Sequence, residues 1–143
     1  MTFDTTLESI MERFRDAEEY ASQQRGGFSL FGLFEREDVP GRWDLVASAP
    51  WLRTGRAGIR ELVDLLGAVF SVQDWNNIAK IIATVLPLEP SAPFVRAATH
   101  KYNAEHQITE VTNAILNGIP VSRAFIITAN ASPSEKAEYS AAA

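Results

Sequence analysis

Cysteine is absent from this chain of 143 residues, and histidine occurs only twice. Without cysteine the protein has no disulfide bond, no thiol nucleophile and no cysteine-based zinc site, and a reducing compartment is permitted. His100 and His106 form a His-x5-His spacing, which matches no common helical zinc motif. We therefore expect no cofactor.

Long apolar runs are also missing. No stretch approaches the length that is needed to cross a bilayer. The N-terminal MTFDTTLESIMERF carries acidic residues where a signal peptide needs a basic region followed by an apolar run. These absences predict a soluble, cytoplasmic protein with no membrane partner.

Positive charge is in short supply as well. Thirteen Lys and Arg residues oppose eighteen Asp and Glu residues, which gives a formal net charge of −5. This balance argues against nonspecific binding to nucleic acid or to an anionic membrane. The hydrophobic share of 46% and the charged share of 22% are typical of a folded globular protein, and the length fits one domain.

Apolar spacing and turn signals predict one α+β domain over residues 1–130, followed by a flexible C-terminal tail over 131–143. The predicted order is α-β-β-α-β-α-β-β, with a largely antiparallel five-stranded sheet packed with helices. Helices are expected over three stretches, namely from Thr5 to the stop at Gly26-Gly27, around Ile59–Phe70, and within 89–103. The first helix should turn a solvated acidic face outward, formed by Glu8, Glu12, Asp16, Glu18 and Glu19.

The stretch FSLFGLF, residues 28–34, is apolar on both faces when it is extended. Alternation places Phe28, Leu30 and Phe34 on one face and Phe31 and Leu33 on the other. Such a strand must be covered on both sides, so we expect it near the centre of the sheet, with the first two helices covering its faces.

Turn residues predict the hairpins. Pro40-Gly41 suits the middle of a type II turn, because glycine tolerates a positive φ. Asn117-Gly118 predicts a type I′ hairpin turn, with Pro120 just beyond it facing outward. Residues 78–86 are rich in β-branched side chains and are interpreted as a strand, although a helix continuing from Val72 is the competing interpretation.

The arginines predict an interaction surface. Residues 36–60 hold five arginines against three acidic residues, whereas the first helix is strongly acidic. Arginine and partly exposed tryptophan dominate binding hot spots. The candidate partner-binding residues are Arg36, Arg42, Trp43, Trp51, Arg53 and Arg56.

Three enzyme patterns compete with this interpretation. Ser48, Asp44 and His100 offer the residue types of a hydrolase triad, but no G-x-S-x-G elbow surrounds Ser48. A second pattern is a hydrolase- or nuclease-like metal site, for which carboxylates cluster at Glu35, Glu37, Asp38 and Asp44.

The third pattern is an arginine-lined anion pocket. The similar hexapeptides SAPWLR, residues 48–53, and SAPFVR, residues 91–96, each place an arginine near an expected helix N-terminus. Serine caps with a following proline explain most of this similarity without a ligand.

The sequence therefore favours a small noncatalytic interaction module that binds a partner protein or self-associates into a homo-oligomer. The alternative is an enzyme with an arginine-lined anion pocket or a carboxylate-bound metal.

Overall fold

The computed structural model describes the backbone of residues 2–131 and the side chains of residues 7–131. The predicted C-terminal tail lies outside the described residues except for Ala131, which is buried. Within the described part the elements follow in the order α1 Thr2–Arg25, β1 Leu30–Glu35, β2 Trp43–Ser48, α2 Gly55–Gly67, α3 Val72–Ala79, β3 Ile82–Leu88, α4 Pro93–Lys101, β4 Thr109–Leu116 and β5 Ile119–Ala129. No helix in this part is long and apolar enough to span a membrane.

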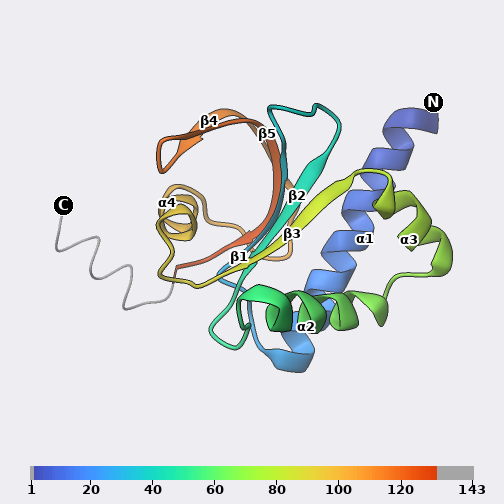
Figure 1. The fold of residues 1–143 in the computed structure, drawn as a ribbon, viewed down its shortest axis with the longest axis horizontal. Helices are drawn as coiled ribbons and strands as arrows, with labels where there is room; N and C mark the ends of the chain where they lie inside the picture. The colour runs from blue at the N-terminus through green and yellow to red at the C-terminus, as the bar shows by residue number, and fades with distance from the viewer. Residues whose placement is uncertain (1, 132–143) are drawn as a thin grey trace, which may run out of the picture.

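The sheet has the strand order β3-β2-β1-β5-β4, in which only the β2–β3 pair is parallel (Figure 1). The predicted α+β class with a largely antiparallel five-stranded sheet is therefore confirmed. Strand β1 occupies the centre, as its two apolar faces predict.

Helices α1, α2 and α3 cover one face of the sheet, and α4 lies on the other (Figure 1). The β4–β5 hairpin bends over α4, so the second face is strongly concave. We call the α1–α3 side the first face and the α4 side the second face.

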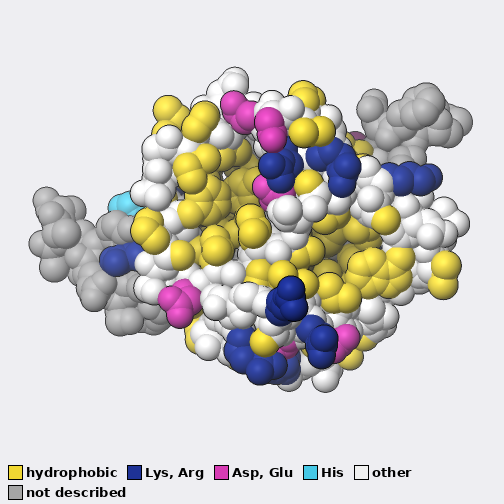
Figure 2. Space-filling model, viewed as in Figure 1, with side chains coloured by type: hydrophobic (Ala, Val, Ile, Leu, Met, Phe, Trp, Pro, Cys, Tyr) yellow, Lys and Arg dark blue, Asp and Glu magenta, His cyan; other side chains and the backbone are white. Residues whose placement is uncertain are grey.

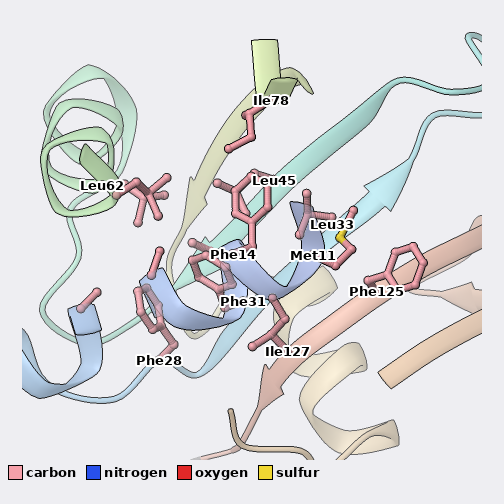
Figure 3. Packing of buried hydrophobic residues seen from close by; sticks show 14 of the residues in the cluster. Met11, Phe14, Phe28, Phe31, Leu33, Leu45, Leu62, Ile78, Phe125 and Ile127 are labelled. Atoms are coloured by element: carbon pink, nitrogen blue, oxygen red, sulfur yellow. The ribbon is translucent and has the colours of Figure 1, made fainter. Parts of the chain in front are cut away.

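The core of the first face contains the largest apolar side chains. Phe14 of α1 packs edge-on against Phe70 with ring centroids 5.2 Å apart, and Phe31 of β1 lies 6.5 Å from Phe14. Met11, Leu33, Leu45 and Leu62 fill the same layer (Figure 3). The apolar stripe that predicts the first helix is thus the stripe that faces the sheet.

The expectation that the first two helices cover the two faces of β1 is wrong. Helices α1 and α2 both pack on the first face, and α4 covers the second face with Val95 and Ala98. Phe28 precedes the strand and packs with Phe31, so it belongs to the first face and not with Leu30 and Phe34. Strand alternation does not apply to a residue outside the strand.

Both predicted turns are confirmed. The Arg42 amide donates to the Val39 carbonyl at 3.1 Å across Pro40-Gly41, and Gly41 has φ +86°. Asn117 and Gly118 both have positive φ, as a type I′ turn requires. Pro120 is exposed, as expected.

The prediction for residues 78–86 is right only in its later part. Helix α3 extends through Ala79, and β3 begins at Ile82. A reciprocal capping box between Ser71 and Asp74 fixes the start of this helix, and the competing interpretation of a helix continuing from Val72 holds through Ala79. The described part of the chain therefore has one more helix than the predicted order.

Candidate functional site

The six predicted partner-binding residues do not form one surface. Arg36 and Arg42 lie in the β1–β2 turn, whereas Trp51, Arg53 and Arg56 follow the far end of β2. A six-residue strand spans about 20 Å, so the two groups lie at opposite ends of the sheet.

Trp43 is not part of an exposed surface, and that expectation is wrong. Its side chain is 2% exposed, and its ring lies 5.4 Å from that of Phe125, with the Arg123 guanidinium stacked outside. Strand β2 is paired on both edges, and Trp43 shares the first face with Leu45 and Ala47. The two-residue spacing from Leu45 and Ala47 was the sequence signal for this burial.

The two arginines of the β1–β2 turn are held by their own chain. Arg36 pairs with Asp38 at 3.1 Å and with Asp44 at 3.6 Å, and Arg42 donates to the Ile82 carbonyl at 2.8 Å. The Arg36 hydrogen bond lowers the pKa of Asp38, and in return Asp38 raises the pKa of Arg36. These arginines act within the fold.

An apolar groove of about 380 Å³ opens on the second face. Figure 2 shows hydrophobic side chains lining a hollow beside the β4–β5 hairpin. The apolar lining comes from β1, β2, β3, α4 and the start of β5, namely Phe34, Val46, Leu86, Leu88, Phe94, Ile119, Pro120 and Val121.

One end of the apolar groove is acidic. Four carboxylates, those of Glu35, Glu37, Asp38 and Asp44, line this end against the single cation of Arg36. Asp44 also accepts a 2.6 Å hydrogen bond from the Thr84 hydroxyl. The carboxylates that the sequence suggests as metal ligands therefore form a negative rim. Among residues 7–131 no group of three or more His, Asp or Glu side chains lies close enough to hold a metal ion.

A second cavity, the arginine pocket, lies between α1 and α2 and measures about 640 Å³. Dark-blue Lys and Arg side chains gather over α2 in the lower part of Figure 2. The lining includes Tyr20 and Arg25 of α1, Arg53 before α2, and on α2 Arg56, Ala57, Arg60, Glu61, Asp64, Leu65 together with Ala68 just beyond it.

Glu61 organises one side of the arginine pocket. Its carboxylate accepts a 2.7 Å hydrogen bond from Arg25 Nη2, and it also lies 3.7 Å from Arg53 Nε. The hydrogen bond from Arg25 is the largest reason that the pKa of Glu61 is lowered. A side chain at Gly58 would collide with the Arg53 carbonyl, so this glycine lets the Arg53 backbone lie against α2.

Trp51 is half-buried and packs beside Arg25, which lines the arginine pocket. Its indole Nε1 donates to the Gly26 carbonyl at 2.8 Å, and its ring packs against Phe28 at 5.1 Å. The Arg25 guanidinium stacks over the indole at 5.0 Å. Trp51 thus joins the end of α1 to the loop before α2.

The residues of the suggested hydrolase triad are not brought together. Ser48 and Asp44 are both on β2, four positions and therefore about 13 Å apart. Ser48 is fully buried, and among the described residues its hydroxyl has no hydrogen-bond partner. His100 is exposed on α4 on the second face.

The two similar hexapeptides do not supply serine caps. The N-cap of α2 is Thr54 and that of α4 is Ala92, whereas Ser48 is the last residue of β2. The similarity reflects no shared capping. Only the first hexapeptide contributes an arginine, Arg53, to the arginine pocket.

A buried polar cluster joins α1 to β5, and the sequence interpretation missed it. Glu18, expected on the solvated face, is completely buried. One carboxylate oxygen lies 2.6 Å from His106 Nδ1, and the other accepts hydrogen bonds from Thr128 and Ser22. Its spacing from Met11, Phe14 and Ala21 places Glu18 on the apolar stripe, and this was the available signal.

Burial alone lowers the pKa of His106, but the hydrogen bond and the charge of Glu18, aided by Glu105 and Glu19, outweigh it and raise that pKa. The pair therefore favours a protonated imidazole against a buried carboxylate. It is a structural link between α1, β5 and the loop before β4.

Comparison with protein-family models, with curated proteins and with solved structures gives no match to this chain. Function can therefore be inferred only from the geometry and charge of the apolar groove and the arginine pocket.

Proposed function

We propose that the protein is a noncatalytic interaction module that binds an apolar, basic segment of a partner protein in the apolar groove. The observation that carries this proposal is an open, concave apolar surface with a negative rim. Exposed apolar surface rimmed by polar residues marks interaction sites, and apolar grooves are one way in which folded domains bind a segment of a partner protein.

Exposure of individual side chains supports the proposal. Leu86 is 40% exposed and Ile119 is 48% exposed, although both line the apolar groove. Covering these side chains with apolar groups of a partner removes them from water, which favours association. Phe34 and Phe94, in edge contact at 5.3 Å, provide a firm floor.

The rim determines the charge of the partner segment. Four carboxylates against one arginine attract a lysine or arginine that follows the apolar side chains. An acidic partner segment is disfavoured by like-charge repulsion. The metal-dependent hydrolase alternative has less support, since the rim carboxylates bind Arg36, Thr84 and the Gly41 amide.

A peptide selection tests the proposal. The full chain is used to select binders from a random phage-displayed peptide library, and the affinity of enriched peptides is then measured by fluorescence anisotropy. We expect enriched sequences that combine apolar residues with Lys or Arg. No enrichment, or enrichment of Asp and Glu, would contradict the proposal.

Two substitutions in the β4–β5 hairpin test whether the partner binds in the apolar groove. Ile119→Asp puts a charge inside the apolar groove and should weaken binding by about tenfold or more. Ile115→Asp is the matched control, because Ile115 is 67% exposed and faces away from its buried neighbours Ala114 and Leu116. Equal affinities for the two variants would move the binding site elsewhere.

A further inference from the structure

The arginine pocket collects positive charge in a chain that is acidic overall. Its lining contains four arginines, one from α1, one from the loop before α2 and two from α2. The opposing negative charges of the lining are the carboxylates of Glu61 and Asp64. Glu61 is already engaged by Arg25 and Arg53. The remaining cations of the lining are Arg56 and Arg60.

Arg56 and Arg60 are four positions apart on α2, so their side chains share one face of the helix. Within residues 7–131 neither side chain forms an ion pair or a hydrogen bond. Two like charges at this spacing repel each other and destabilise the helix. An anion bound between them removes this repulsion.

The start of α2 adds to the same potential. Its first turn has no acidic residue, and the N-cap Thr54 makes no side-chain hydrogen bond to the first amides. Ala57, in that first turn, lines the arginine pocket. The positive end of the helix dipole therefore adds to the guanidinium charges.

We propose that the arginine pocket binds the phosphate group of a phosphate monoester. A monoester carries about −1.5 to −2 charge at pH 7 and three terminal oxygens. Those three oxygens offer more acceptor positions to two guanidinium forks than the two oxygens of a carboxylate do. The four arginines exceed the two carboxylates by two charges, which matches a dianion.

The volume leaves room for the organic part of the ligand. A cavity of about 640 Å³ exceeds the size of a phosphate ion, and Tyr20 and Leu65 provide a less charged wall. The ester can be a small free metabolite or a phosphorylated serine side chain. Both present the same phosphate group, so the test compares them directly.

Isothermal titration calorimetry of the full chain tests the proposal with two probes, ribose 5-phosphate and N-acetyl-phosphoserine amide. We expect saturable binding of at least one ester, and the tighter one identifies the source. Arg56→Gln/Arg60→Gln should weaken that binding by about 10- to 100-fold, as expected for loss of charged hydrogen bonds. Both residues are exposed, so the melting temperature of the double variant should not fall.

Two controls make the result specific. Arg15→Gln removes one positive charge on α1 outside the arginine pocket and should leave the affinity unchanged. Arg56→Lys/Arg60→Lys keeps the net charge and should still bind more weakly than the wild type, because lysine lacks the guanidinium fork. The proposal is overturned if neither ester saturates the wild type, or if either double variant binds as tightly as the wild type.

Discussion

The two faces of the sheet are covered to different extents. On the first face, three helices and the sheet bury a cluster of nineteen apolar residues, which includes five phenylalanines and Trp43. On the second face, α4 is the one helix of residues 2–131 that covers a cluster of twelve, several of which are alanine or valine. The first face is closed by its helices, whereas the second retains an open apolar groove.

Element lengths explain this difference. Helix α4 has nine residues and is about 14 Å long, whereas β5 has eleven residues and reaches about 36 Å. One short helix does not cover a bent sheet of that length, so apolar side chains at the start of β5 stay exposed. Within the described residues, the groove is thus a consequence of how little helix lies on the second face.

The arginines of the two sites also differ in whether they bind other groups of the same chain. Arg36 and Arg42, near the apolar groove, bind acidic side chains and a carbonyl of the same chain. Arg56 and Arg60, in the arginine pocket, have no such partner among the described residues. Sequence clustering of arginine alone therefore does not identify a binding site, because local pairing decides which cations are free for a ligand.

The largest expected effect comes from removing one phenylalanine from each face, which tests whether the first face is covered more completely than the second. Phe31→Ala empties a completely buried position among Phe14 and Phe28 and should lower the free energy of unfolding by about 3–5 kcal/mol. Phe34→Ala, in the floor of the apolar groove, should cost less than about 3 kcal/mol, because the vacated volume opens to the groove. Urea denaturation of both variants measures the difference.

A larger loss for Phe34→Ala than for Phe31→Ala would contradict the unequal closure of the two faces. The groove would then be a tightly packed part of the core, and its role as a docking surface would lose support.

Trp51→Ala should have the next largest effect, about 2–3 kcal/mol in chemical denaturation. The substitution removes the ring contact with Phe28 and the hydrogen bond to Gly26. Trp51→Phe keeps a ring and loses only the donor, so it should cost about 1 kcal/mol. A loss below about 1.5 kcal/mol for Trp51→Ala would instead fit the sequence interpretation of Trp51 as a partly exposed partner-binding residue.

Local stereochemistry made much of the fold predictable. Asn117-Gly118 and Pro40-Gly41 specify their turns through φ, and the two apolar faces of 28–34 specify a central strand. The face on which each helix packs was not predictable. An apolar stripe indicates that a helix packs on a sheet, but both faces of the sheet can accept it. The same ambiguity misplaced the cover of Leu30 and Phe34, which comes from α4.

The candidate sites were less predictable than the fold. Arg53 and Arg56 were identified from the sequence, and Arg60 shares a face of α2 with Arg56, but Arg25 joins them only because α1 and α2 pack side by side. The apolar groove depends on the bend of β5 and the position of α4, neither of which is a local property. Burial of Glu18 required a polar partner, His106, far away along the chain.

The smallest expected effect concerns this buried pair. Glu18 and its neighbours raise the pKa of His106 above its ordinary value of 6.5, despite the opposing effect of burial. A pKa that is higher in the folded state than in the unfolded state stabilises the fold fully below about pH 6.5, and this contribution is lost as the pH rises through the folded-state pKa. The link between α1 and β5 should therefore weaken on going from mildly acidic to mildly alkaline solution.

Denaturant unfolding of the wild type and His106→Gln at several pH values between about 5.5 and 8.5 measures this contribution. We expect the wild type to exceed the variant in stability by most at the acidic end, with the difference shrinking as the pH rises. Glutamine can still donate a hydrogen bond to Glu18, but it carries no charge and does not titrate. A difference that is constant, or that grows with pH, would mean that His106 stabilises the first face as a neutral side chain and that its pKa is not raised.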